Sequence, residues 1–263
     1  MLDAFDRKLS YLRISVTDRC DLACVYCAPP EGYPLLREEE LLPLESIVKI
    51  ARAAVGLGIT KLRLTGGEPL LREGIVGLTG ELAAIPGLER LGMTTNGTRL
   101  AASAAELRAA GLDSVNVSLD TLDPRRYQTL TRGGRLERVL AGIDAALAAG
   151  LDVKLNIVVL GDEAQAEAVE AYARERGAAS QRIRLYDLRE PKRDDPGFDR
   201  PPRCEECNRL RLLADGRLLP CLHSELARPV DMERIEESLL ECARRKPARG
   251  ASCATLGVGQ IGG

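Results

Sequence analysis

Short apolar runs alternate with helical patterns along the first two thirds of the chain. Runs rich in Val, Ile, Leu and Thr, short enough to be buried strands, lie at 11–17, 61–65, 90–94, 114–119, 152–160 and 182–188. Helical patterns cover 43–56, 100–110, 136–149 and 163–176, and Asp123-Pro124 is typical of a helix start. Gly111, Gly150 and Gly177 follow three of these patterns, where glycine commonly ends a helix.

This alternation predicts an α/β fold with a parallel sheet, right-handed crossovers and helices outside. Six strand–helix units are too few for a closed eight-stranded barrel, so we expect a partial (β/α)6 TIM-like barrel or, alternatively, an open doubly wound sheet. The barrel is expected to cover 1–188, followed by a linker at 189–203 that is rich in proline and charge. A smaller region, 204–263, carries a hairpin-like 210–219 with Asp215-Gly216 at its turn and a helix near 231–245.

Composition narrows the class of protein. The 263 residues have a formal net charge of -2 and are 3% aromatic, which argues against nucleic-acid binding. No long apolar run and no targeting region at the start are present, so we expect a cytoplasmic protein that binds neither membrane nor nucleic acid. His223 is the single histidine, which excludes mechanisms that need two imidazoles.

Eight cysteines are unusual in a chain without a secretory signal, and they indicate metal or redox chemistry rather than disulfides. The first set, Cys20, Cys24 and Cys27, directly follows the first predicted strand. Cysteine thiolates hold iron–sulfur clusters, and three ligands leave one iron open for a substrate or cofactor. The alternative is a zinc knot or a group of buried thiols.

The second set is Cys204, Cys207 and Cys221. It fits either a second cluster or, together with His223, a tetrahedral Cys3His zinc site. Iron analysis separates the two, because a structural zinc predicts about four irons per chain and two clusters predict about eight. Cys242 fits a packed thiol on a helix, and Cys253 matches no pattern.

The first set, with Tyr26 between its last two cysteines, resembles the signature of the radical S-adenosylmethionine superfamily. The resemblance implies a [4Fe-4S] cluster whose open iron is chelated by S-adenosylmethionine, which is cleaved to methionine and a 5′-deoxyadenosyl radical. Tyr26 is then near the cofactor. Thr65-Gly66-Gly67-Glu68-Pro69, which alone is typical of a turn, resembles the segment that binds the cofactor's amino group, so Gly67 and Glu68 are implied as cofactor-binding. Ser118, at the end of the fourth strand, is implied to face the cofactor.

Within this superfamily the chain resembles GTP 3′,8-cyclase, the first enzyme of molybdenum-cofactor biosynthesis, a lyase. The matching segments include Leu12-Arg13-Ile14-Ser15-Val16-Thr17-Asp18-Arg19, Met93-Thr94-Thr95-Asn96-Gly97, Ser118-Leu119-Asp120-Thr121, Cys207-Asn208-Arg209-Leu210-Arg211 and the terminal Ile261-Gly262-Gly263. The resemblance implies a second [4Fe-4S] cluster that binds the purine of GTP. Hydrogen abstraction from C3′ of the ribose and attack on C8 then give 3′,8-cyclo-7,8-dihydro-GTP.

The resemblance also implies site residues and partners. The GTP contacts are Arg13, Arg63, Thr94, Lys154, Arg209 and Arg211. Arginine binds phosphate bidentately, and Arg209 and Arg211 share one face if their segment is extended, although a lone arginine is usually a surface charge. Gly262 and Gly263 are implied to reach the active site and assist cofactor cleavage. The implied partners are an electron donor such as flavodoxin or ferredoxin, a downstream cyclic pyranopterin monophosphate synthase and a second copy in a homodimer.

Two departures from the family concern the substrate. The family has a longer segment where only 189–203 stands here, and Arg189 occupies the place of a methionine near S-adenosylmethionine. An alternative is therefore a two-cluster radical enzyme that acts on a peptide or another small molecule. A third hypothesis is a non-catalytic metal-binding or scaffold protein with the same fold.

Overall fold

The computed structural model describes residues 1–29, 31–185, 187–199 and 202–255. One nine-stranded sheet has the order β6-β5-β4-β3-β2-β1-β7-β8-β9. Strands β1 to β7 pair in parallel, and β8 and β9 are antiparallel additions. The strands are β1 Tyr11–Ser15, β2 Lys61–Thr65, β3 Arg90–Thr95, β4 Ser114–Ser118, β5 Asp152–Val159, β6 Ala179–Arg184, β7 Arg209–Leu212, β8 Arg217–Leu219 and β9 Arg228–Pro229.

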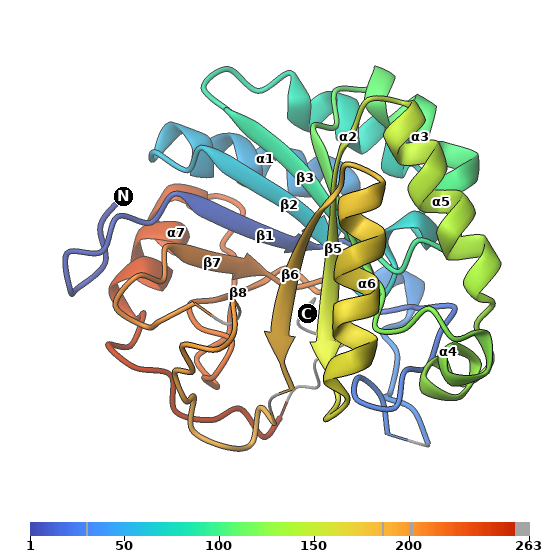
Figure 1. Ribbon diagram of the computed structural model, residues 1–263. Helices are drawn as coiled ribbons and strands as arrows, with labels where there is room; N and C mark the ends of the chain where they lie inside the picture. The colour runs from blue at the N-terminus through green and yellow to red at the C-terminus, as the bar shows by residue number, and fades with distance from the viewer. Residues whose placement is uncertain (30, 186, 200–201, 256–263) are drawn as a thin grey trace.

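The helices lie along the outer side of the curved sheet (Figure 1). They are α1 Leu44–Gly56, α2 Ile75–Ala83, α3 Leu100–Ala109, α4 Pro124–Thr131, α5 Leu136–Ala148, α6 Glu163–Glu175 and α7 Ile235–Arg244, with 3-10 turns at Glu38–Glu40 and Pro69–Leu71. The expected α/β partial barrel is confirmed, because the inner face of the sheet encloses a cavity rather than packing on a second layer of helices. None of the helices in the described part of the chain is long and apolar enough to span a membrane.

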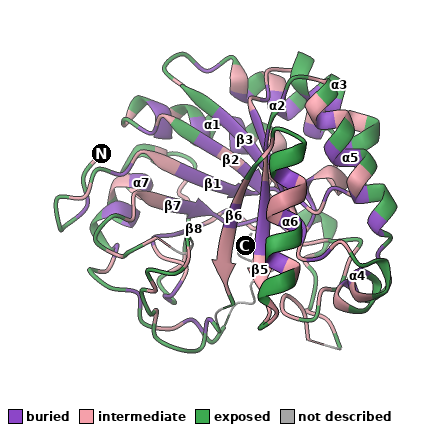
Figure 2. Cartoon of the chain, viewed as in Figure 1, coloured by how far each residue is buried: buried purple, intermediate pink, exposed green. Residues whose placement is uncertain are grey.

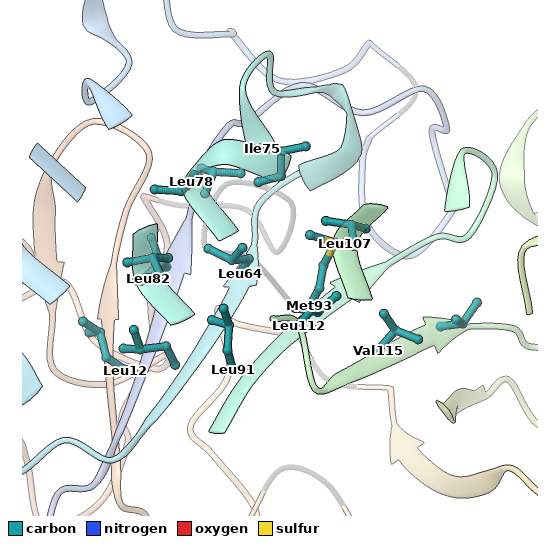
Figure 3. Packing of buried hydrophobic residues seen from close by; sticks show 14 of the residues in the cluster. Leu12, Leu64, Ile75, Leu78, Leu82, Leu91, Met93, Leu107, Leu112 and Val115 are labelled. Carbon is teal, nitrogen blue, oxygen red and sulfur yellow. The ribbon is translucent and has the colours of Figure 1, made fainter. Parts of the chain in front are cut away.

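Strands β1 to β4 place most of their apolar side chains outward, whereas polar side chains such as Arg13, Arg63 and Asn116 line the cavity. Leu64, Leu91 and Met93 on the outer face pack against Leu78 and Leu107 of the covering helices (Figure 3). In Figure 2 the inner strands are largely buried, whereas the helices alternate between buried and exposed faces. Burying an aliphatic side chain contributes about 1.5–3 kcal/mol, so the stabilising core lies between sheet and helices. The interior of the barrel is left for polar residues.

The expected boundaries of the barrel helices 43–56, 100–110, 136–149 and 163–176 agree with the structure to within one residue, whereas the helix expected near 231–245 begins only at Ile235. The Asp123 side chain accepts hydrogen bonds from the N–H groups of Arg125 and Arg126, which caps the helix that Pro124 begins. Helix α2 was not expected, because its segment contains two glycines and few polar residues to mark a helical period.

The sixth strand begins earlier than the apolar pattern predicts, at Ala179 instead of residue 182, and ends at Arg184 instead of 188. Gly177, with φ +69°, ends α6, and the Ala178 N–H bonds to the Ala173 carbonyl. The chain therefore enters the sheet at once, with Ala179 opposite Lys154 of β5. Tertiary pairing thus overrides the weak strand propensity of these residues.

The C-terminal region extends the barrel sheet. Strand β7 pairs in parallel with β1, and the expected hairpin to β8 forms around Asp215-Gly216. The described residues of 189–203 contain neither helix nor strand. The division of the chain at this segment stays a prediction.

Candidate active site

Both cysteine sets face one cavity of about 310 Å3 at the carboxyl ends of the parallel strands. The predicted site residues that line it are Arg13, Cys20, Cys24, Tyr26, Cys27, Arg63, Gly67, Thr94, Ser118, Lys154, Cys204, Cys207, Arg209, Arg211 and Cys221. Parallel strands bring their carboxyl ends to one edge, which explains why segments so distant in sequence meet here. Gly262 and Gly263 lie outside the described residues.

The loop that carries the first cysteine set is held by main-chain hydrogen bonds to the end of α4. The Ala23 N–H donates to the Thr131 carbonyl at 3.2 Å, and the Val25 N–H donates to the Leu130 carbonyl at 2.9 Å. Within the loop, the N–H of Cys27 donates to the Cys24 carbonyl at 2.9 Å. These bonds fix the spacing of the thiols before any ligand binds.

Two adjacent glycines after β2 lie directly against the chain that leads to Cys20. A Cβ at Gly66, where φ is +144°, would lie 2.3 Å from the Thr17 carbonyl oxygen, and one at Gly67 would lie 2.2 Å from that of Arg19. No side chain fits at either position. The Gly67 N–H bonds to the Thr17 carbonyl at 2.9 Å, so the two loops form one wall of the cavity.

Glu68 does not line the cavity, contrary to the expectation that its carboxylate faces the cofactor. It is fully buried and accepts hydrogen bonds from the Thr95 hydroxyl at 2.8 Å and the Asn96 N–H at 2.7 Å. Burial raises its pKa to about 7. Protein donors occupy both carboxylate oxygens. Glu68 therefore joins the turn after β2 to the end of β3.

Tyr26 lines the cavity as expected and is held there by Asp120, a residue whose role the motifs did not reveal. The Tyr26 hydroxyl donates to Asp120 Oδ2 at 2.6 Å, and the Val158 N–H donates to Oδ1 at 2.7 Å. Burial raises the pKa of Asp120 to about 6. Ser118 lies two residues earlier on β4 and also faces the cavity.

Two thiols of the first set, those of Cys24 and Cys27, are half-buried, which affects metal loading. Burial, with the neighbouring thiol of Cys27 as a smaller cause, raises the pKa of Cys24 to about 12, and burial raises that of Cys27 to about 11. These groups are therefore protonated at neutral pH, and binding of metal must release their protons. Three sulfur donors in one loop, with space in front of them, fit an iron–sulfur cluster.

Cys204 and Cys207 precede β7, and Cys221 follows β8, so the sheet brings the second set together. Burial acts to raise the pKa of Cys207, but the Lys246 ammonium and the Arg209 N–H outweigh it and lower the pKa. His223 is buried, with Nδ1 3.3 Å from the Glu190 carbonyl oxygen. Among the residues described, no three Cys, His, Asp or Glu side chains, in either cysteine set, are gathered around a single metal position.

Cationic side chains point into the barrel between the two cysteine sets. Arg13 on β1 stands in register with Arg63 on β2 and Arg211 on β7, so three guanidinium groups lie at one level. Lys154 on β5 and Arg209 on β7 face the same interior. The interior therefore carries these five cationic side chains.

Arg63 is held by hydrogen bonds to three strands of the barrel, β1, β3 and β4. Its Nε donates to the Tyr11 hydroxyl at 2.6 Å, and its Nη1 donates to the Met93 carbonyl at 2.8 Å and Asn116 Oδ1 at 2.9 Å. A Cβ at Gly92 would lie 2.7 Å from Nη2, so only glycine leaves room beside the guanidinium. This fixed fork can receive an anion without reorganisation.

Tyr11 is a site residue that motif reasoning missed. The guanidinium carbon of Arg209 lies 5.3 Å from the centre of its ring. Burial acts to raise the pKa of its phenol, but three surrounding guanidinium groups, led by that of Arg63, lower it to about 8. Strand periodicity could have identified Tyr11, because residues two apart in a strand point to the same face and Arg13 was already a predicted site residue. By the same rule Asn116 and Ser118 share the inward face of β4.

A second hollow of about 760 Å3 opens at the opposite end of the barrel. It shares Tyr11, Arg63, Asn116, Lys154 and Arg209 with the first cavity. These residues therefore lie where the two hollows meet, with space on either side of them.

Arg189, expected in place of a methionine near the cofactor, is turned away from the cavity. Its side chain is 76% exposed and pairs with Asp187 at 2.7 Å. The charge is therefore solvated and does not face a sulfonium in the cavity.

The fold and the cysteine sites define the class of protein. The family model of the radical SAM superfamily matches residues 14–174, and the chain belongs to this superfamily. Two solved structures share the fold: Streptococcus suis SuiB bound to S-adenosylmethionine (17% identity, TM-score 0.69, 92% of this chain and 65% of that chain) and anSMEcpe with bound AdoMet (16%, TM-score 0.65, 90% and 81%). The cofactors are S-adenosylmethionine and two [4Fe-4S] clusters, and the two sets of three cysteines fit them; Cys20 is exposed at the rim and the other five are half-buried.

Curated relatives narrow the family. The GTP 3′,8-cyclase of Peptoclostridium acidaminophilum is 39% identical over 94% of this chain and 92% of its own length. That of Moorella thermoacetica is 43% identical over 85% and 84%, and GTP 3′,8-cyclase 1 of Pseudomonas aeruginosa is 42% identical over 94% and 93%. The chain belongs to the GTP 3′,8-cyclase family. The first of these alignments extends over 299 positions although the chain has 263 residues, so that relative has residues that this chain lacks.

Proposed function

We propose that the protein converts GTP to 3′,8-cyclo-7,8-dihydro-GTP, the first step of molybdenum-cofactor biosynthesis. The observation that carries this proposal is the placement of a cationic interior between two cysteine sets that face one cavity. A nucleoside triphosphate has one polyanionic end and one heteroaromatic end, and this cavity offers a partner for each. The family to which the chain belongs supports the same substrate.

The residues divide into three tasks. Cys20, Cys24 and Cys27 hold the first cluster, and the Gly67 loop forms the wall against which S-adenosylmethionine lies. Cys204, Cys207 and Cys221 hold the second cluster, on which the purine is placed. When bound, these groups supply the electron transfer and the radical that act on the nucleotide.

The protein itself binds and orients the triphosphate. Arg13, Arg63 and Arg211 form a row of cationic side chains across three neighbouring strands. Lys154 and Arg209 add charge from the two sides, and Thr94 offers a hydroxyl whose buried oxygen has no hydrogen-bond partner among the described residues. Fixing the phosphates deep in the barrel leaves the ribose between the two cysteine sets, which is the placement that the reaction needs.

Replacing Tyr11 by Phe should weaken GTP binding while leaving cofactor cleavage intact. The change removes the acceptor of the Arg63 Nε hydrogen bond and keeps the ring under Arg209. A hydrogen bond to a charged group contributes about 1.5–3 kcal/mol, so we expect KM for GTP to rise about tenfold, with a smaller effect on kcat.

The same variant tests the pH dependence. Because the pKa of Tyr11 is lowered to about 8, raising the pH through 8 creates a phenolate beside the phosphates and repels them. We therefore expect GTP affinity of the unchanged protein to fall across this range and the Tyr11→Phe variant to lack that step. An identical pH profile in both proteins would contradict this role of Tyr11.

Anaerobic incubation with GTP, S-adenosylmethionine and dithionite tests the function. We expect loss of GTP, formation of 5′-deoxyadenosine and appearance of the cyclised nucleotide in chromatography with mass detection. Formation of 5′-deoxyadenosine without loss of GTP would refute GTP as the substrate. That result would favour the alternative, a two-cluster radical enzyme acting on a peptide or another small molecule, while absence of any cleavage would favour the scaffold hypothesis.

The proposal also covers the finer assignments. The reaction places the enzyme among the lyases of the cytoplasm, with a flavodoxin- or ferredoxin-like electron donor and a downstream cyclic pyranopterin monophosphate synthase. Cys20 is exposed at the cavity rim, which gives a donor a short path to the first cluster. The homodimer and the participation of Gly262 and Gly263 in cofactor cleavage stay predictions.

A further inference from the structure

One short segment after α7 contacts the whole second cysteine set. The Gly250 N–H donates to Cys204 Sγ at 3.4 Å, and a Cβ at Gly250 would lie 3.3 Å from Cys221 Sγ. At the start of the segment, the Lys246 ammonium lies near the Cys207 thiol and acts to lower its pKa. Residues 246–250 therefore lie beside all three thiols, although no residue of this segment belongs to the sequence motifs of the site.

Lys246 joins the two chain segments that carry these thiols. Its side chain is buried, with 2% of the residue exposed. The ammonium donates to the carbonyl of Arg209 at 2.8 Å and to that of Pro220 at 2.8 Å. Arg209 follows Cys207 by two residues, and Pro220 directly precedes Cys221, so one cation sets the distance between two ligands.

Among the described residues, no carboxylate forms an ion pair with the Lys246 ammonium, whose hydrogen bonds go to the carbonyls of Arg209 and Pro220. A buried ammonium is costly unless an anion lies close to it, and two neutral carbonyls do not supply one. Three thiolates around an oxidised [4Fe-4S] core leave a net negative charge, which is the partner that the geometry lacks.

Arg7 keeps this segment in place. Its Nη1 donates to the Cys204 carbonyl at 2.6 Å, and its Nη2 donates to the Pro247 carbonyl at 2.7 Å. Asp3, whose side chain is fully buried, accepts from Arg7 Nε at 2.6 Å and orients the guanidinium. Arg7 therefore holds the backbone next to Lys246, while the Arg209 and Pro220 carbonyls hold its ammonium.

We propose that Lys246 is a positioning residue for the second cluster: its ammonium spaces Cys207 from Cys221 and, as a buried positive charge between the chain segments that carry them, raises the reduction potential of that cluster. Hydrogen bonds to sulfur and net charge are two of the determinants of such potentials. The inference rests on the proposed function only in taking the second cysteine set as a cluster site, and it needs no GTP.

The test is a redox titration of the reconstituted holoenzyme without GTP, followed by EPR of each reduced cluster. Lys246→Met removes the charge and keeps the length of the side chain, whereas Lys246→Arg keeps the charge. Arg245→Met is the matched control, because its exposed guanidinium pairs with Glu241 on the surface.

In Lys246→Met we expect the ratio of reduced to oxidised second cluster at a given potential to fall about tenfold, which is about 59 mV for one electron. Lys246→Arg should retain most of the potential, and Arg245→Met and the first cluster should be unchanged. An unaltered potential in Lys246→Met, or an equal shift in Arg245→Met, would overturn the proposal. Loss of the second cluster in both Lys246 variants would overturn it too, because arginine keeps the charge. Inactivity toward GTP affects none of these readings.

Discussion

Replacing Cys24 by Ala is expected to abolish cleavage of S-adenosylmethionine. The variant leaves only two thiols in the first set, too few to hold the cluster from which the electron comes. Iron should fall from about eight to about four per chain, because the second set is untouched. Formation of 5′-deoxyadenosine under anaerobic reducing conditions, measured by chromatography, is expected to drop below detection.

Cys242→Ala is the matched control for this variant. Cys242 is also buried, but it packs in helix α7 within the hydrophobic core and does not line the cavity. We expect it to keep both the iron content and the cleavage activity. Equal losses in the two variants would mean that cysteine removal damages the fold in general, and persistent cleavage in Cys24→Ala would contradict the assignment of the first set.

The double variant Arg209→Ala with Arg211→Ala should lose GTP binding and keep cofactor cleavage. Each arginine contributes hydrogen bonds between charged groups, worth about 1.5–3 kcal/mol apiece, so affinity should fall at least about a hundredfold. Isothermal titration under anaerobic conditions measures this, and uncoupled 5′-deoxyadenosine formation reports the first cluster.

Arg217→Ala provides the comparison on the neighbouring strand. Arg217 lies on β8, is partly exposed and pairs with Asp215, outside the cavity. Its removal should leave GTP affinity within about twofold, since an exposed ion pair contributes about 0–1 kcal/mol. Normal GTP affinity in the double variant would refute the binding of GTP by these two arginines, whereas loss of iron from it would show that β7 supports the second cluster instead.

Much of the architecture could be predicted because local rules and tertiary pairing agree. Strands such as Lys61–Thr65 carry alternating side chains, apolar outward and polar inward, and Asp123-Pro124 starts a helix by capping alone. The cysteine spacing and the Gly66-Gly67 turn were recognisable because chemistry demands those residue types at those positions. Most predicted site residues indeed line one cavity.

What could not be predicted depends on contacts between distant segments. β6 starts at Ala179 because β5 offers a partner there, not because its residues favour strands. Glu68 belongs to a conspicuous motif, yet its oxygens are used by Thr95 and Asn96. Lys246 carries no motif at all, and only the folding of α7 against the sheet brings it to Cys207. Sequence spacing reveals ligands, whereas the residues that support them are found only in three dimensions.

The proposed function requires that the cavity present the ribose of GTP to chemistry that starts at Cys20, Cys24 and Cys27. A single anaerobic turnover with GTP deuterated at C3′ examines this directly, by mass spectrometry of the 5′-deoxyadenosine that forms. The account predicts one deuterium atom in that product and none in a parallel reaction with GTP deuterated at C8. Unlabelled 5′-deoxyadenosine from the C3′-deuterated nucleotide would contradict it.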